Sequence, residues 1–247
     1  MKFVYNQPAI VIGKNLLVAD VHVGAEFELQ QKGVLIPLQH KETAEKINAI
    51  LEETNCDTLY ILGDVKHDFF GAKDREIRML NSFFHSINAK SIVIKGNHDA
   101  EVEKISGVKT VEPQGLLLKH GGVSYLLVHG HCYPQEKDFE KADWIIMGHH
   151  HPMVEIKESE GFTWRERAWI IGEFQQPAKK FAIIPAFGEL AGGIAFNTAE
   201  PMGPFFARHG LNKNKTQAVL LNGVKLGSLE SLETGNKKRK SKKALRQ

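Results

Sequence analysis

The sequence predicts an α/β (α+β) protein in which two packed, mixed β-sheets are flanked by helices. Three observations lead to this prediction: strands and helices alternate early in the chain, hairpin-like pairs of strands dominate its second part, and polar motifs follow five of the strands. Alternation favours parallel pairing with crossover helices, whereas hairpins favour antiparallel pairing. At 247 residues the chain is long enough to bury a sizeable core.

Five short apolar runs predict buried strands, because they are rich in Val, Ile, Leu and Tyr and are bounded by glycine or polar residues. These runs are NLLVA (15–19), DTLYIL (57–62), SIVIK (91–95), VSYLLV (123–128) and DWIIM (143–147). Two helices are predicted, over 39–53 and 74–87, where apolar side chains recur on one helix face. The order strand, helix, strand, helix, strand predicts right-handed crossover connections.

The second half of the chain predicts antiparallel pairing. Gly121-Gly122 separates LLLKH from VSYLLVH, and Asn222-Gly223 separates two further strand-like runs, the strongest short signal for a hairpin. Other strand-like runs lie within 153–197. Because neither a repeat nor a low-complexity linker interrupts this pattern, we expect one domain over residues 1–235 rather than two independent domains.

Composition excludes several classes of protein. No run approaches the ~20 apolar residues of a membrane helix, so we expect no membrane partner, and the start MKFVYNQP lacks the apolar stretch of a secretory signal. The only cysteines are Cys56 and Cys132, too few for a disulfide framework. A reducing cytoplasm is therefore the expected location.

The net charge of +3 is unevenly distributed. Seven of the 32 basic residues fall in 236–247 (NKKRKSKKALRQ), so the remainder carries 25 basic against 29 acidic residues. Such a like-charge block predicts a disordered tail. The tail, with its charges from Lys237 to Arg246, is either a nucleic-acid contact or a solvated terminus, and the sequence leaves both interpretations open.

A motif of Asp, Asn or His follows each of the five predicted strands. The motifs are DVH (20–22), GD (63–64), GNHD (96–99), HGH (129–131) and GHHH (148–151). Binding crevices of open α/β sheets form at the carboxyl ends of the strands, so motifs distant in sequence can meet there. Carboxylate, amide and imidazole groups suit divalent ions such as Mn²⁺, Fe²⁺, Ni²⁺ or Zn²⁺. We therefore expect a two-metal hydrolytic site at this edge.

Two ions in one site need a ligand that reaches both. Asp64 suits this role because its two carboxylate oxygens can bridge ions ~3.5–4 Å apart. The i, i+2 spacing of Asp20 and His22 places both on the same side of an extended turn. The same spacing applies to the first and third histidines of GHHH, with His150 pointing away. A metal-bridging water, with its pKa lowered towards ~7, would then be the nucleophile.

The ordered motifs resemble the calcineurin-like metallophosphoesterase superfamily, whose pattern is D-x-H, G-D, G-N-H-[D/E], H and G-H-x-H. Each motif alone has an ordinary explanation: GNHD could be a turn, and GHHH an adventitious metal trap. Together and in order, between Asp20 and His151, they are highly specific. The resemblance implies a metal-dependent phosphoesterase built as a sandwich of two β-sheets.

The resemblance also implies the role of each motif residue. One ion would be held by Asp20, His22, Asp64 and His151, and the other by Asp64, Asn97, His129 and His149. The expected cofactors are two divalent ions, Mn²⁺ before Fe²⁺, Ni²⁺ or Zn²⁺. His98 would assist at the leaving group or the phosphoryl oxygens, and Asp99 would orient its imidazole. His131 is left as a hydrogen-bond donor to a ligand or as a substrate contact. The family often has G-D-x-x-D where His67 ends the pattern here, so the role of His67 stays open.

Longer strings such as DVHVGAE and LGDVKH are similar, more loosely, to a small prokaryotic group of predicted phosphoesterases related to the DNA ligase-associated metallophosphoesterase. This implies cleavage of phosphodiesters, with phosphomonoesters as a further class, in a phosphate-ester substrate that can be nucleotide-like. The alternatives are a nuclease in DNA repair and a catalytically silent interaction scaffold. Silent members have replaced motif residues and none is replaced here, so the enzyme is favoured.

Overall fold

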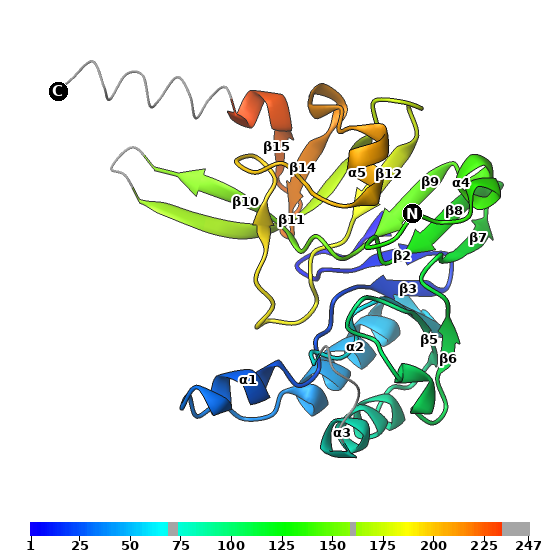
Figure 1. Cartoon of the computed structure of the whole chain (residues 1–247), viewed down its shortest axis with the longest axis vertical. Coiled ribbons are helices and arrows are strands. Elements are labelled where there is room, and N and C mark those ends of the chain that lie inside the picture. Colours follow the sequence, from blue (N-terminus) through cyan, green and yellow to red (C-terminus); the bar gives the residue numbers. More distant parts are fainter. Residues whose placement is uncertain (69–73, 159–161, 234–247) are drawn as a thin grey trace.

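Two β-sheets packed face to face form the centre of the computed structural model, and helices cover their outer sides (Figure 1). The structure describes residues 1–68, 74–158 and 162–233. This arrangement confirms the predicted fold class of two mixed sheets flanked by helices. The predicted basic tail at 236–247 lies outside the described residues.

The first sheet has the strand order β1-β2-β3-β4-β5-β6. Its strands are β1 (Lys2–Phe3), β2 (Ile10–Ile12), β3 (Asn15–Val18), β4 (Thr58–Leu62), β5 (Lys90–Ile94) and β6 (Lys109–Val111). From β3 to β6 the neighbours are parallel, whereas β1, β2 and β3 pair antiparallel. The helices α2 (His40–Thr54) and α3 (Asp74–His85) connect β3 to β4 and β4 to β5, as predicted.

The second sheet follows the order β13-β10-β11-β12-β9-β8-β7; in addition, β14 pairs with β11, and β15 pairs with β14. Its strands are β7 (Leu116–His120), β8 (Val123–Val128), β9 (Trp144–Met147), β10 (Pro152–Lys157), β11 (Thr163–Glu173), β12 (Lys180–Ile183), β13 (Ile194–Ala195), β14 (Gln217–Leu220) and β15 (Lys225–Ser228). Both predicted hairpins are confirmed as β7–β8 and β14–β15. However, β8, β9 and β12 pair in parallel, so this half is less antiparallel than predicted.

Three apolar layers hold the sheets and helices together. Between the sheets, side chains such as Leu17, Tyr60 and Ile92 meet side chains such as Leu127, Ile146 and Trp169. Helices α2 and α3 cover the other face of the first sheet, and α4 (Glu136–Lys141) and α5 (Pro204–His209) cover the second (Figure 1). Each such Leu, Ile or Phe contributes about 1.5–3 kcal/mol by leaving water. This packing holds the ends of β3 and β4 in a fixed position relative to the ends of β8 and β9.

Several short elements escaped prediction, among them α1 (Ala25–Gln31), α4, α5 and the strands β1 and β2. Helices of six or seven residues have too few turns to show a clear period. Within the described residues, no helix combines the length and the apolar character needed to cross a membrane.

Candidate metal centre

The strands β3, β4, β5, β8 and β9 bring their polar motifs to one place at the edge of the two sheets. Each motif begins within three residues of the end of its strand. Parallel strands end at the same edge, so the motifs converge there. The structure thus brings together all seven residues predicted as ligands: Asp20, His22, Asp64, Asn97, His129, His149 and His151.

The first ligand group consists of Asp20, His22, Asp64 and His151, whose ligating atoms lie within 4.8 Å of one another. The Nε2 atoms of His22 and His151 are 3.2 Å apart. The distance from His151 Nε2 to Asp20 Oδ1 is 3.4 Å, and that from His22 Nε2 to Asp64 Oδ2 is 4.0 Å. Both carboxylates and His22 are buried. The group therefore concentrates two negative charges away from bulk water.

The second ligand group consists of Asp64, His129 and His149, again with ligating atoms within 4.8 Å. The Nε2 atom of His129 is 3.3 Å from Asp64 Oδ2 and 3.2 Å from His149 Nδ1. It is also 3.0 Å from the amide oxygen of Asn97, which places this residue beside the group. Asp64 belongs to both groups, the arrangement that two ions with a shared ligand require.

Left-handed backbone aims these side chains. The φ angle is 54° at Asp20, 50° at His22, 49° at Asp64, 68° at His149 and 41° at His151. A non-glycine residue seldom adopts this conformation, which costs of order 1–3 kcal/mol and is concentrated at functional sites. Asp20 and His22 themselves adopt the left-handed conformation, which brings both side chains into the first ligand group. The extended turn that we predicted for these residues is therefore wrong.

Backbone carbonyls fix two of the imidazole rings. His129 donates from Nδ1 to the carbonyl oxygen of Leu62, and His151 donates from Nδ1 to that of Gly192, both at 2.8 Å. In a neutral ring this leaves Nε2 without a proton, so its lone pair is directed into the ligand group. Histidine ligands of metals are commonly oriented by such a hydrogen bond at the other ring nitrogen.

The second ligand group attracts positive charge. Burial raises the pKa of Asp64, but the hydrogen bond and charge of His129 outweigh burial and hold this pKa below its usual range. Burial likewise lowers the pKa of His129, whereas Asp64 and Asp20 raise it to about 9. The carboxylates that favour a proton on His129 would also favour a metal cation at the same place. Burial lowers the pKa of His22 and His149 to about 4, which keeps both rings in the neutral form that binds metals.

These donors fit divalent ions. Carboxylate, amide and imidazole ligands without a thiolate suit ions such as Mn²⁺, Fe²⁺, Ni²⁺ and Zn²⁺. In the neutral state the ring nitrogens of His22 and His151 face each other at 3.2 Å beside Asp20 and Asp64. Two carboxylates that converge in this way repel one another, and a cation between them would offset this repulsion. The structure therefore supplies residues that can hold two ions.

The glycines of the motifs make this close approach possible. A Cβ atom on Gly63 would lie 2.3 Å from His129 Nδ1, and one on Gly96 would lie 2.2 Å from Asp64 Oδ1. Real Cβ atoms do not come so close to other heavy atoms, so a larger residue at either position would displace a predicted ligand. The glycines of G-D and G-N-H-D are thus needed for packing between motifs.

His98 lies beside the two groups, with its Nε2 atom 3.8 Å from Asp64 Oδ2. Its Nδ1 donates to the carbonyl oxygen of His67 at 2.6 Å. We predicted that Asp99 orients this ring, but the carboxylate of Asp99 forms its hydrogen bonds with backbone N–H groups instead. Its carboxylate accepts the backbone N–H groups of Val65 at 2.9 Å and of Gly96 at 2.8 Å. Asp99, 1% exposed, thus holds together the loops that carry Asp64 and His98.

The remaining histidines of the motifs lie around the ligand groups. His150 points away as predicted, and its buried ring is 5.2 Å from that of Phe206. The half-buried ring of His131 is 5.1 Å from that of His129. His67 Nε2 lies within hydrogen-bonding distance of a Glu28 carboxylate oxygen, at 2.9 Å, and its ring centroid is 5.4 Å from that of His22. In the sequence, the only signal for the contact between His67 and Glu28 was the position of His67 shortly after Gly63-Asp64.

The chain is similar to a known family and to several known structures. Residues 14–184 match the family model of the calcineurin-like phosphoesterases. The crystal structure of the nuclease MPE of Pseudomonas putida is similar, with a TM-score of 0.54 and 21% identity, and the match covers 85% of each chain. The phosphoesterase YfcE of E. coli matches with a TM-score of 0.41 and 16% identity, over 86% of this chain and 96% of that chain.

A curated relative matches a smaller part of the chain. It is nonribosomal peptide synthetase 32 of Fusarium pseudograminearum (strain CS3096), 27% identical over 115 residues, or 41% of this chain. The chain spans about 1% of the length of that relative. The family match, in contrast, spans well over half of the chain and includes every residue of both ligand groups, so the chain belongs to the calcineurin-like phosphoesterase family.

Proposed function

We propose that the chain is a phosphodiesterase that uses two divalent metal ions and water to hydrolyse phosphate esters, with phosphomonoesters as a second class of substrate. The observation that carries this proposal is the position of Asp64 in both ligand groups, each completed by histidines from the other sheet. A shared carboxylate can hold two ions at the ~3.5–4 Å separation of two-metal hydrolytic sites. Membership of the calcineurin-like phosphoesterase family supports the same reaction class.

The ligands of the two ions follow from the ligand groups. Asp20, His22, Asp64 and His151 would hold the first ion, and Asp64, Asn97, His129 and His149 the second. When bound, the ions would lower the pKa of a water between them to near neutrality and withdraw charge from the phosphate oxygens. We propose Mn²⁺ as the metal, with Fe²⁺, Ni²⁺ and Zn²⁺ as alternatives that the same donors accept.

His98 acts on the leaving group in this proposal. Because its Nδ1 proton is donated to the carbonyl of His67, only Nε2 can exchange a proton with a substrate. The doubly protonated ring would give the Nε2 proton to the leaving oxygen, or would stabilise negative charge on a phosphoryl oxygen. Asp99 contributes as a positioning residue, because it connects the His98 loop to the backbone after Asp64.

A direct experiment combines metal analysis with an assay. The purified protein is loaded with Mn²⁺, its metal content is measured by mass spectrometry, and hydrolysis of bis-p-nitrophenyl phosphate and p-nitrophenyl phosphate is followed. We expect two equivalents of metal and faster cleavage of the diester, both abolished by a chelator. A protein that binds two ions and cleaves neither ester would contradict the proposal.

A nuclease is the second candidate. The similar structure from Pseudomonas putida is described as a nuclease, and the sequence from Lys237 to Arg246 is strongly basic. The same assay with single- and double-stranded DNA tests this candidate. If DNA is the substrate, deletion of residues 236–247 should weaken DNA binding and flatten its dependence on salt, because fewer phosphates would be neutralised.

A further inference from the structure

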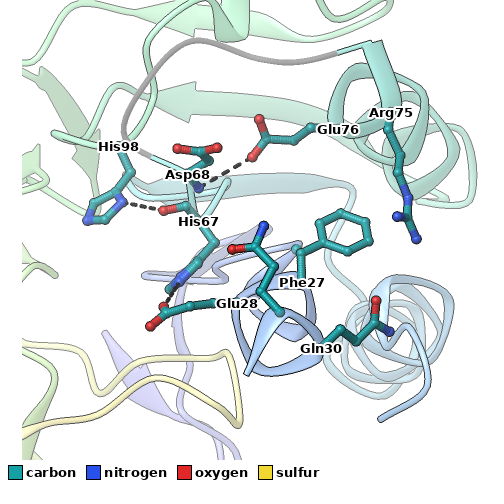
Figure 2. Close-up of a pocket in the computed structure, with 10 residues that line it drawn as sticks. Phe27, Glu28, Gln30, His67, Asp68, Arg75, Glu76 and His98 are labelled. Carbon is teal, nitrogen blue, oxygen red and sulfur yellow. Dashed lines mark hydrogen bonds and ion pairs between the residues drawn. The ribbon is translucent and has the colours of Figure 1, made fainter. Parts of the chain in front are cut away.

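A cavity of about 720 Å³ lies next to the candidate metal centre, between helices α1 and α3. We call it the α1–α3 cavity. Its lining includes Phe27 and Gln31 from α1, Arg75 from α3, and the histidines His67 and His98. Cavities of this size, partly apolar and with a few polar groups, are typical of sites for small organic groups. Figure 2 shows how Phe27, Arg75, His67 and His98 lie around the space.

The cavity and the metal centre share a wall. His98 lines the cavity, and its Nε2 atom is 3.8 Å from Asp64 Oδ2. His67 also lines it, with its ring centroid 5.4 Å from that of the predicted ligand His22. A phosphate bound at the centre would therefore have the cavity directly beside it, past these two rings. One of its ester groups can extend into that space.

Away from the centre, the cavity has a flat wall. The guanidinium carbon of Arg75 lies 4.0 Å from the centre of the Phe27 ring, so the two planar groups are in contact. In the view of Figure 2 both lie on the opposite side from His98. Phe27 is half-buried against the core, whereas Arg75 is exposed. Aromatic rings and guanidinium groups both stack on flat organic groups, including nucleobases.

The charges of the lining disfavour a second phosphate. Three carboxylates, those of Glu28, Asp68 and Glu76, line the cavity with Arg75. Hydrogen bonds from Lys32 and from His67 lower the pKa of Glu28 to about 2, so it stays ionised. An anion in this cavity would meet like charges. The occupant that the lining favours is therefore uncharged and flat, and the exposed amide of Gln31 can bond to a polar edge.

We propose that the α1–α3 cavity binds the flat, uncharged ester group of the substrate, a nucleobase or an aryl ring, with Phe27 and Arg75 as the residues that determine this specificity. The proposal rests on the proposed phosphodiesterase function and names its substrate class. It predicts that substrates with such a group bind more tightly than alkyl esters of the same charge.

Equilibrium binding tests this specificity with three probes that each carry one phosphate: thymidine 5′-monophosphate, phenyl phosphate and methyl phosphate. Titration calorimetry measures their affinity for the Mn²⁺-loaded protein. We expect at least one of the two ring-bearing probes to bind roughly 5- to 150-fold more tightly than methyl phosphate, the range of one stacking contact. A preference for thymidine 5′-monophosphate alone would indicate a nucleobase, and a preference for phenyl phosphate too would indicate any flat ring.

Two variants locate the effect. Arg75→Ala removes an exposed side chain, and Phe27→Leu keeps an apolar group against the core. Both should reduce the preference for ring-bearing probes and leave the affinity for methyl phosphate unchanged. Arg78→Ala is the matched control, because Arg78 is exposed on the same helix and does not line the cavity. Melting temperatures verify that each variant is folded.

Equal affinity of the wild-type protein for all three probes would overturn the inference, as would a preference that survives in both variants. Failure of the proposed function has a different signature. It would show as absence of Mn²⁺-dependent hydrolysis of methyl p-nitrophenyl phosphate by the wild-type protein, whatever the three affinities are. The two outcomes are therefore separable.

Discussion

The two sheets contribute different chemistry to the candidate centre. The first sheet supplies the oxygen donors, Asp20, Asp64 and Asn97, together with one imidazole, His22. The second sheet supplies imidazoles only, His129, His149 and His151. Neither sheet carries a complete ligand group. The packing between the sheets is therefore part of the site, and the two ions would act as a bridge across it.

The largest expected effect comes from the residue that both groups share. Asp64→Asn keeps the size of the side chain but removes the charge between His129 and His22. We expect loss of both ions and a fall of diesterase activity to background, because a shared carboxylate serves each ion. Metal analysis and the bis-p-nitrophenyl phosphate assay measure the two effects. Asp57→Asn is the matched control, since Asp57 is an exposed aspartate that pairs with Lys14. A fully metallated, active Asp64→Asn protein would exclude the bridge.

A ligand from the second sheet should matter to one ion only. His151 belongs to the first ligand group and not to the second. We therefore expect His151→Gln to lower the metal content from about two equivalents to about one, whereas Asp64→Asn removes both. If His151→Gln removes both ions, the groups are not independent and the comparison of the sheets has to be revised. Metal analysis after exhaustive dialysis distinguishes these outcomes.

The next effect concerns catalysis without loss of metal. His98→Ala should retain both ions and lower kcat by ~10²–10⁴-fold, the usual contribution of a positioned acid or base. His85→Ala is a suitable control, because this exposed histidine lies at the end of α3. Steady-state kinetics on verified metal-loaded protein provide the measurement. Unchanged turnover of His98→Ala would remove His98 from the mechanism.

Ions that bridge the sheets should also stabilise the fold. A free ion at 100 times its Kd adds about 2.7 kcal/mol to the free energy of unfolding for each site. For a chain of this length that corresponds to about 5–11 °C in Tm. Thermal melts with and without Mn²⁺ measure the shift, and a chelator should reverse it. An equal shift in Asp64→Asn would mean that the ions bind elsewhere.

The smallest effect is on the stability of the second sheet in acid. Burial, and then the charge of His149, lower the pKa of His150 to about 3, from 6.5 in the unfolded chain. Between these values the unfolded state binds the additional proton, so this contribution to stability is complete above pH 6.5 and is lost as pH falls towards 3. The slope is at most about 1.4 kcal/mol per pH unit.

His150→Leu should remove that slope, because a leucine packed against Phe196 and Phe206 binds no proton. Denaturant unfolding at pH 7 and pH 5 measures the free energy of unfolding of both proteins. The difference between the two pH values should be smaller in the variant than in the wild-type protein. If the difference is the same in both, His150 does not remain neutral in the folded state.

Local patterns in the sequence were sufficient to predict the longer helices and the strands that carry the candidate centre. Helices α2 and α3 and strands β3, β4, β5, β8 and β9 were predicted because each is long or apolar enough to show its own period. Short elements such as α1 and α5 have no such period. The parallel pairing of β12 with β9 was missed because it joins segments more than thirty residues apart, without a turn motif to reveal it.

By itself, the sequence determined which residues gather at the candidate centre, because each motif follows a strand and the carboxyl ends of parallel strands meet at one edge. Only the tertiary structure decided how they gather. The left-handed backbone of Asp20 and Asp64, the carbonyls of Leu62 and Gly192 that orient two rings, and the contact of Phe27 with Arg75 all depend on distant segments. Such contacts arise from packing, which leaves no periodic signal along the chain.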